Sequence, residues 1–162
     1  MELWKVIPEF PNYEVSTEGR VRNRSTDKFM ALNMNQYGVV FVGLFNRGQH
    51  KKGVARLVAQ AFIERNFPAY NTPINIDGDR WNNSVNNLAW RPRWFAVKYN
   101  RQFRVLYEHH IPYPIQDIKT GETSIDSFEC ARLYGLLEKD VVQSIHNRTY
   151  TWPTYQQFRV VE

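Results

Sequence analysis

The segment Pro73–Ala96 constrains the fold of this chain more than any other stretch. It opens with PINIDGD, a short apolar run that ends in Asp-Gly, and this pair is a strong signal for a tight turn after a strand. An asparagine-rich loop follows, and NNLAW then predicts a second short strand. Pro92 suits the first turn of a helix, so RPRWFAVKYNRQF is predicted to be helical. The segment therefore predicts two strands and a helix in succession.

Residues 1–54 predict an antiparallel β-sheet module. YEVST and GRVRNRS alternate apolar and polar residues on either side of a turn near Glu18 and Gly19, and YGVVFVGLF predicts a buried strand. The NRGQHKKG that follows predicts a turn rich in positive charge. ARLVAQAFIE predicts a helix because its apolar residues recur at helical spacing, at Leu57, Val58, Ala61 and Phe62.

The chain from residue 108 onwards predicts a small hairpin and then two short helices. EHHIPYPIQDIKTGETS is a connector that runs into a hairpin with its turn at Thr120 and Gly121. In SFECARLYGLLEKDVVQSIHNRTY we expect Ser127 to cap the first helix and Gly135 to end it. The second helix should bury an apolar face formed by Val141, Val142 and Ile145. Its opposite, polar face should be exposed and consists of Lys139, Gln143, His146 and Asn147.

These patterns predict an α+β protein in three segments. They are a β-sheet module over residues 1–54, a strand–strand–helix unit over 55–107, and a connector with paired helices over 108–162. A chain of 162 residues can bury a real hydrophobic core. Its formal net charge of +5 permits nucleic acid as a partner, but many ordinary soluble proteins are equally basic.

Composition excludes several other classes of protein. Cys130 is the only cysteine, so neither an internal disulfide nor a cysteine-rich zinc site can form, and a reducing compartment is expected. The N-terminal MELWKVIPEF lacks the pattern of a signal peptide, and no apolar run approaches membrane-spanning length. We therefore expect a cytoplasmic protein with no membrane partner.

The motifs occur in the order found in phage HNH homing endonucleases, and the sequence resembles that family over nearly its whole length. WKVIPEFPNYEVSTEGRVRNR resembles the DNA-binding module at the front of such enzymes, at Trp4, Ile7, Tyr13, Val15, Ser16, Gly19 and Val21. VARLVAQAF resembles a family motif that has His at the place of Ala55. The HNH hairpin is matched at Asp77, Gly78, Asn82, Asn83, Asn87, Leu88 and Trp90. SFECARLYGLLEKDVVQSIHN resembles the helix-turn-helix that closes some members.

The resemblance implies a ββα-metal (HNH) unit whose chemistry needs four positions, and this chain keeps only Asn87. The position of the histidine base holds Asn75, whose carboxamide cannot take a proton at neutral pH. The two positions of metal ligands hold Ile74 and Ala96, although hard divalent cations need oxygen ligands. We therefore expect a degenerate site with no catalytic residue, no metal and no cofactor.

Other residues leave alternatives open. Asp77, Asp79 and Asn100 could supply rearranged ligands for Mg²⁺ or Mn²⁺, although Asp-Gly is equally a plain turn signal. His109 and His110 are adjacent, so on an extended connector at the surface their side chains point to opposite sides. Cys130 sits at helical spacing and is expected in the core.

Three surfaces carry candidate contacts to double-stranded DNA. Arg20, Arg22 and Arg24 alternate along GRVRNRS, so in a strand they share one face, and such a ribbon can enter the major groove. The other candidates lie on neighbouring strands, on the linking helix and on the last helix: Asn33, Asn35, Lys51, Lys52, Arg91, Arg93, Lys98, Arg101, Lys139, Gln143, Asn147 and Arg148. Each surface can also be an ordinary solvated face, and Glu138 and Asp140 would repel phosphates at the start of the last helix.

The preferred hypothesis is a DNA-binding protein derived from a phage HNH homing endonuclease that has lost catalysis. One alternative is an active metal-dependent nicking enzyme with rearranged ligands. Another is an interaction protein recruited into a phage particle or a polymerase complex. Aromatic side chains beyond the needs of a small core favour that last alternative, namely Trp81, Trp94, Trp152 and Tyr155.

Overall fold

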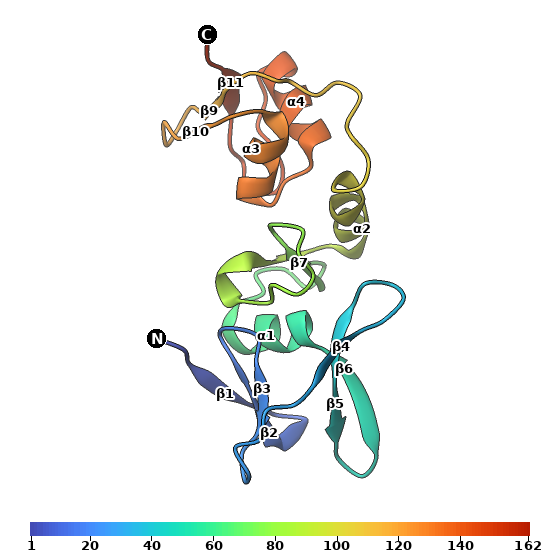
Figure 1. Ribbon diagram of the computed structural model, residues 1–162. Coiled ribbons are helices and arrows are strands. Elements are labelled where there is room, and N and C mark those ends of the chain that lie inside the picture. Colours follow the sequence, from blue (N-terminus) through green and yellow to red (C-terminus); the bar gives the residue numbers. More distant parts are fainter. The chain divides into compact units, whose positions relative to one another are not determined.

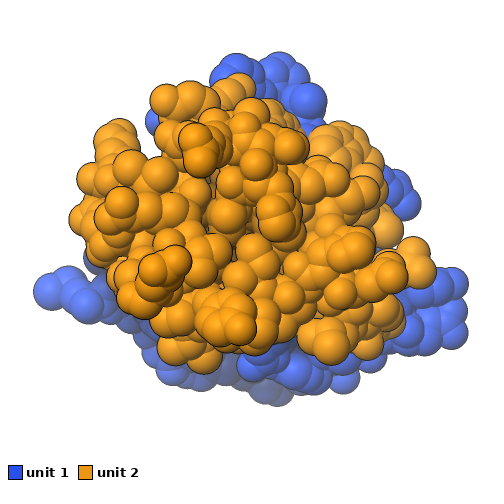
Figure 2. Space-filling model, turned by 90° about the horizontal axis from the view of Figure 1, so that it is seen from above, with its two compact units in different colours: residues 1–93 blue, residues 94–162 orange.

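The computed structural model describes residues 1–162, whose contacts form two compact units, Met1–Arg93 and Trp94–Glu162 (Figure 2). The chain folds into four α-helices and several small antiparallel sheets, which confirms the predicted α+β class. None of these helices combines the length and apolar character that crossing a membrane requires. The three functional segments expected over 1–54, 55–107 and 108–162 stay a prediction, because compactness alone assigns no role to a segment.

Unit 1 begins with a sheet of β1 (Trp4–Ile7), β2 (Phe10–Ser16) and β3 (Val21–Asn23), in that order. The predicted turn between β2 and β3 is present, and Gly19 takes a left-handed φ of 79° there. A Cβ added to Gly19 would lie 2.9 Å from the Cβ of Asn83. This turn therefore needs glycine both for its backbone conformation and for its close approach to a later loop.

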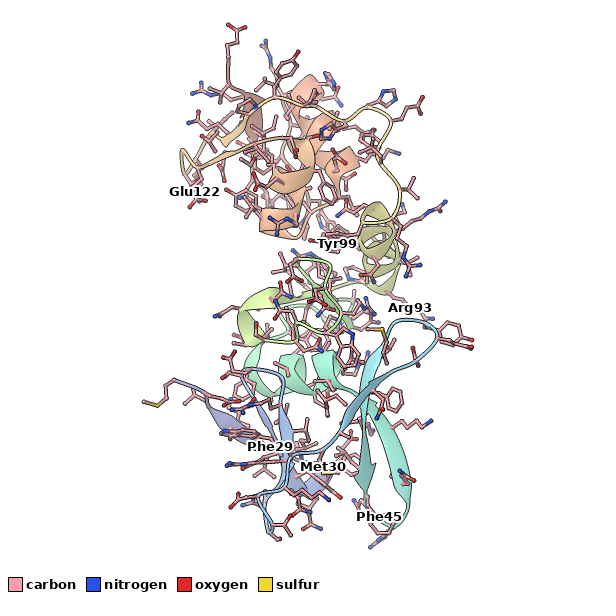
Figure 3. All side chains as sticks on the ribbon, viewed as in Figure 1. Phe29, Met30, Phe45, Arg93, Tyr99 and Glu122 are labelled. Carbon is pink, nitrogen blue, oxygen red and sulfur yellow. The ribbon has the colours of Figure 1, made fainter.

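The second sheet contains β4 (Leu32–Met34), β5 (Val40–Phe45) and β6 (Gln49–Gly53), with β5 in the middle. The buried strand predicted from YGVVFVGLF is confirmed by β5. The turn predicted over NRGQHKKG is too long, because Gln49–Gly53 pairs with β5 as a strand. Figure 3 shows Phe45 at the far end of this hairpin, where its side chain is exposed. Charged residues suit β6 because it is an edge strand, where they oppose unwanted pairing.

Helix α1 (Val54–Phe62) confirms the helix predicted from ARLVAQAFIE. It contacts both N-terminal sheets and the later strands of unit 1, so it lies at the centre of this unit (Figure 1). Val54 and Val58 are fully buried, and they share a core with residues of β2, β3 and β5. Burying a valine side chain contributes roughly 1.5–3 kcal/mol, so this helix holds the small sheets together.

The predicted hairpin is formed by β7 (Thr72–Asn75) and β8 (Leu88–Arg91), which pair antiparallel. A short 3₁₀ turn, η1 (Val85–Asn87), leads into β8. Asn75 stands opposite Leu88 at the loop end of the hairpin, where the long connecting loop begins. The loop therefore starts at Asn75, the position where the family resemblance implies a catalytic base.

Unit 2 contains most of α2 (Arg93–Gln102), followed by β9 (Ile115–Asp117), β10 (Thr123–Ser124), α3 (Ser127–Tyr134), α4 (Glu138–Asn147) and β11 (Phe158–Val160). The predicted small hairpin and both short helices are confirmed. Strand β11 was not predicted, and it pairs with β9 to complete a sheet of order β10-β9-β11. Cys130 lies in the core of this unit, as expected. Residues 135–137 join α3 to α4.

The start of α3 differs from the prediction. The cap is Asp126, whose carboxylate accepts the backbone N–H of Glu129 at 2.7 Å. Ser127 is instead fully buried, and its hydroxyl accepts the backbone N–H of Ile111 at 2.9 Å. Serine and aspartate can both cap a helix. Here Ser127 does not cap α3 because its hydroxyl is engaged with other residues inside the unit. The predicted end at Gly135 is confirmed by its left-handed φ of 61°.

Candidate functional site

Asn75, at the position implied for a catalytic base, is buried and fastened by its side chain. Its Nδ2 donates to the carbonyl of Asn82 and to Oδ1 of Asn83, both at 2.9 Å. Only 2% of Asn75 is exposed, and the neighbouring Ile74 is fully buried. The carboxamide therefore serves as a structural link between the end of β7 and the loop that follows.

The loop is closed by a reciprocal pair between Asp77 and Asn87. Asp77 donates its backbone N–H to Oδ1 of Asn87 at 3.0 Å, and Asn87 Nδ2 donates back to Oδ1 of Asp77 at 2.8 Å. Asn82 Nδ2 donates to the other carboxylate oxygen of Asp77 at 2.8 Å. Gly78 forms the tight turn with a φ of 79°. Asp77 and Gly78 thus have the turn-forming role that the sequence left open.

The second loop carboxylate, Asp79, has a similar local role. Its Oδ1 accepts the backbone N–H of Trp81 at 2.9 Å, while its own N–H donates to Asp77. These two contacts make successive turns in which a side chain caps the backbone two residues on. Both carboxylates that could have replaced a metal ligand are therefore engaged in shaping the loop.

The residues present do not fit a divalent cation at the implied position. Ile74 and Ala96 are buried hydrocarbon side chains, and Ala96 belongs to the other unit. No group of three or more His, Cys, Asp or Glu side chains in the chain could hold a metal ion. Mg²⁺ and Mn²⁺ require several oxygen ligands, so this hairpin supplies a hydrogen-bonded amide network where a ligand set would be needed.

The predicted arginine ladder is only partly assembled. Arg20 and Arg22 share a face and both stack on the ring of Trp4, with Arg22 Cζ 4.1 Å from its centroid. Each also forms an ion pair within the unit, Arg20 with Glu2 and Arg22 with Glu14 at 2.6 Å. The hydrogen bond from Arg20 lowers the pKa of the Glu2 carboxyl. These contacts offset the positive charge that the ladder was expected to offer to DNA.

The other candidates in unit 1 have mixed environments. Arg24 donates to the carbonyl of Pro11, and Lys52 pairs with Glu9 at 2.7 Å. Lys51 is exposed and lies over the ring of Phe41. Asn33 is exposed on β4. Asn35 follows that strand, and its Oδ1 accepts two backbone N–H groups of its own turn. Arg24, Asn33, Asn35 and Lys51 are all exposed, but Arg24 and Asn35 also use side-chain atoms in hydrogen bonds within the unit.

Arg91 corrects one prediction about the linking region. Its side chain is not on the surface: the residue is 9% exposed, and Nη1 donates to the carbonyl of Trp90. It belongs to β8 rather than to the helix, which explains its burial. On α2 itself the candidates are exposed as expected, namely Arg93, Lys98 and Arg101.

Helix α4 exposes the predicted polar face, while Glu138 departs from expectation. Lys139, Gln143, Asn147 and Arg148 are all exposed. Glu138 is 2% exposed, accepts the hydroxyl of Ser127 at 2.6 Å and lies 2.7 Å from Nδ1 of His110. It therefore cannot face phosphates. His110 is accordingly a structural contact of the connector, whereas His109 packs on Tyr107.

Several aromatic side chains are exposed in both units. Trp81 and Trp94 are each about half exposed, at 52% and 53%, and Tyr155 is 69% exposed. Within unit 2, Trp94 stacks on Trp152 with ring centroids 5.5 Å apart. These are the residues that the sequence marked as exceeding the needs of a small core.

Comparisons with known proteins agree with this arrangement. Residues 2–45 match the NUMOD4 motif. The chain is 36% identical over 88 residues to an uncharacterized HNH endonuclease of Acanthamoeba polyphaga mimivirus, and 29% identical over 93 residues to the H-N-H endonuclease F-TflII of Escherichia phage T5. Its fold matches that of the HNH homing endonuclease I-HmuI, with a TM-score of 0.55 and 21% identity over 98% of both chains. The chain is thus similar in sequence to HNH endonucleases over about half of its length, and its fold is similar to that of an HNH homing endonuclease.

The extent of these matches differs between sequence and structure. The two sequence relatives are matched over 54% and 55% of this chain, but over only 26% and 47% of their own lengths. The chain thus spans less than half the length of the curated relatives it matches. The family resemblance predicted from the sequence is confirmed, and the activity of this chain has to be argued from its own residues.

Proposed function

We propose that this protein binds double-stranded DNA on an HNH homing endonuclease fold and no longer cuts it. The single observation that carries the loss of cutting is Asn75, a buried carboxamide whose Nδ2 is held by two acceptors. A general base contributes roughly 10²–10⁴-fold to a reaction rate, and a carboxamide cannot act as one. The loop carboxylates nearby already accept backbone and amide N–H groups.

The exposed cations of α2 and α4 support the DNA-binding part of the proposal. In helix-turn-helix proteins the second helix enters the major groove, and here α4 follows α3 after a short turn and exposes Lys139, Gln143 and Asn147. The burial of Glu138 removes a repulsive carboxylate from that surface. Relatives named as HNH endonucleases, and a fold neighbour whose structure concerns DNA binding and cleavage, support the same partner.

Two assays test the two halves of this proposal. Purified protein with Mg²⁺ or Mn²⁺ should leave a supercoiled plasmid intact, and Asn75→His should not restore nicking because Ile74 and Ala96 still supply no ligand. Duplex DNA should bind with an affinity that falls steeply with salt, as expected for about 5–8 neutralised phosphates. Nicking by the wild-type protein refutes the loss of catalysis and favours rearranged ligands. A flat salt response refutes the binding surface.

A matched pair of variants locates the binding surface on α4. Lys139→Gln should weaken duplex binding and reduce the slope of log K against log salt by about one, because one phosphate contact is lost. Lys119→Gln removes the same charge from an exposed residue in the turn between β9 and β10, outside the proposed surface, and should bind like wild type. Equal effects of the two substitutions would mean that only net charge matters.

A second candidate function is an interaction protein within a phage particle or a polymerase complex. The observation that favours it is the pair of half-exposed rings of Trp81 and Trp94, the second of which stacks on Trp152. Aromatic residues are enriched at protein interfaces. Pull-down in high salt with nuclease treatment separates the two functions, because a protein complex survives both conditions whereas a DNA-bridged one does not.

A further inference from the structure

A cavity of about 280 Å³ lies in unit 1 directly beside Asn75. Its walls come from the start of β5, the end of β6, the start of α1, strand β7 and the loop before η1. Its polar side chains are those of Arg56, Thr72, Asn75, Arg80 and Asn83, whereas Gly53 and Ala55 contribute almost no side-chain volume. A water molecule takes up about 30 Å³ in the liquid, so the cavity has room for a small ionic group.

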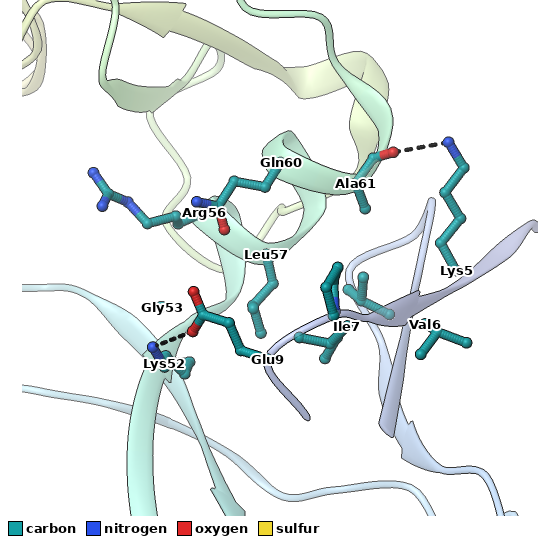
Figure 4. A pocket seen from close by; sticks show the side chains of 12 residues that line it. Lys5, Val6, Ile7, Glu9, Lys52, Gly53, Arg56, Leu57, Gln60 and Ala61 are labelled. Atoms are coloured by element: carbon teal, nitrogen blue, oxygen red, sulfur yellow. Dashed lines mark hydrogen bonds and ion pairs between the residues drawn. The ribbon is translucent and has the colours of Figure 1, made fainter. Parts of the chain in front are cut away.

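The lining of this cavity selects for negative charge. It includes two arginines and no carboxylate. By contrast, the groove of about 510 Å³ between β1 and α1 includes Glu9, which pairs there with Lys52 (Figure 4). The cavity beside the start of α4 is lined by Glu108 and Glu138 as well as by cations. The cavity at Asn75 therefore has a uniformly positive character that these other hollows lack.

Main-chain carbonyls hold both guanidinium groups at the cavity wall. Arg56 Nη2 donates to the carbonyl of Asn71 at 2.6 Å, and Arg80 Nε donates to the carbonyl of Gly38 at 3.0 Å. Each guanidinium has five N–H donors, so a contact with a carbonyl orients the group without cancelling its charge. A positioned pair of cations binds an anion better than mobile ones because less side-chain entropy is lost.

The amide network of the hairpin also determines where Arg80 lies. Asn83 Nδ2 donates to the main-chain carbonyl of Arg80 at 3.1 Å, while Oδ1 of Asn83 accepts from Asn75. Both asparagines are 2% exposed. The substitution of an amide for a base at position 75 thus ties β7 to the segment that carries a cavity arginine.

We propose that this cavity binds one phosphate group of the DNA backbone, with Arg56 and Arg80 as its ligands. The proposal rests on the DNA binding proposed above and names two residues that would contact the DNA backbone. A guanidinium matches the geometry of phosphate oxygens with two parallel N–H groups. The phosphate is held but not activated, because no base or metal ligand lies beside it.

The first test compares the salt dependence of duplex binding. Arg56→Gln and Arg80→Gln should each weaken binding about tenfold and each reduce the slope of log K against log salt by about one. Arg65→Gln removes the same charge from an exposed residue outside the cavity and should keep the wild-type slope. If both cavity variants keep the wild-type slope, the phosphate site is overturned. The proposed function still holds in that case, provided that the wild-type protein binds the duplex with a steep salt dependence.

Conservative variants separate a phosphate contact from a folding defect. Arg56→Lys and Arg80→Lys keep the charge but lose the forked geometry, so they should bind more weakly than wild type with an unchanged slope. Thermal unfolding of every variant identifies any that fail to fold. If the Gln variants do not fold, a wild-type affinity in both Lys variants overturns the proposal.

The second test reads the cavity directly through the side-chain amide signals of Asn75 and Asn83. Inorganic phosphate and a short duplex should each shift these signals in the wild-type protein, and neither should do so in the doubly substituted Arg56→Gln, Arg80→Gln protein. Shifts with inorganic phosphate alone overturn the assignment to DNA and identify a site for a small phosphate. No shift with either probe overturns the site.

Discussion

Replacing Gly19 by alanine tests how the first sheet supports the hairpin loop. Gly19 has a φ of 79°, and an added Cβ would lie 2.9 Å from the Cβ of Asn83. Gly38, in the same unit, has a similar φ of 74° but no heavy atom within 4 Å of an added Cβ. The two positions therefore share the backbone cost of alanine and differ in the collision.

The magnitudes follow from these two contributions. A left-handed conformation costs an alanine about 1–2 kcal/mol, and this is the whole effect expected for Gly38→Ala. The collision adds an overpacking cost of about 1–3 kcal/mol, so Gly19→Ala should lower the free energy of unfolding by about 2–5 kcal/mol. The smaller unfolded-state effect of replacing glycine applies to both variants and cancels in their difference.

The assay is urea unfolding followed through the backbone amide signals of unit 1, because separate units need not unfold together. A second readout is the side-chain amide signal of Asn75, which Asn83 holds at 2.9 Å. It should shift in Gly19→Ala and stay in place in Gly38→Ala. Equal destabilisation in the two variants, or an unmoved Asn75 signal, would refute the claim that this turn supports the loop.

Three further predictions concern unit 2. Glu138→Ala removes the carboxylate that accepts the hydroxyl of buried Ser127 and that contacts His110, so it should lower the free energy of unfolding in urea by about 1–3 kcal/mol. The exposed control Lys139→Ala should change it little. Burial opposes ionisation of Asp117, but hydrogen bonds from Gln156 and from two backbone N–H groups outweigh it and lower the pKa of its carboxyl. A lowered carboxyl pKa gives stability that is present above the pKa of the unfolded chain and lost as pH falls through that of the folded one. Asp117→Asn should therefore reduce the loss of stability in acid, and an unchanged acid profile would contradict this reasoning. Burial raises the pKa of the Cys130 thiol to about 12, so a thiol reagent at neutral pH should label the native protein far more slowly than the urea-unfolded one.

The elements that the sequence predicted well have strong local signals. Helix α1 has apolar residues at helical spacing, and β5 is an apolar run, mainly valine and phenylalanine, that lies between Gly38 and Gly48. Strand β6 was missed because QHKKG has almost no apolar residue, and only its pairing with β5 makes it a strand. Strand β11 was missed because it has only three residues and becomes a strand through its ladder with the distant β9.

The polar residues show the same division. Glu138 was expected at the surface because a carboxylate early in a helix usually points to water, yet contacts from Ser127 and His110 compensate its burial. Arg56 and Arg80 carry no sequence signal that relates them, because they come from α1 and from the loop before η1. Only the fold brings both to the cavity beside Asn75.

By itself the sequence determined which chemical groups this protein can present: an amide at position 75 and hydrocarbon at positions 74 and 96, whatever their surroundings. It also showed the resemblance to HNH homing endonucleases, because those motifs occur in the order found in that family. The tertiary structure alone decided which polar side chains are buried, which cations meet at one cavity and which carboxylates are engaged. The physical reason is that reactivity belongs to a residue type, whereas burial, pairing and distance depend on residues far apart in the chain.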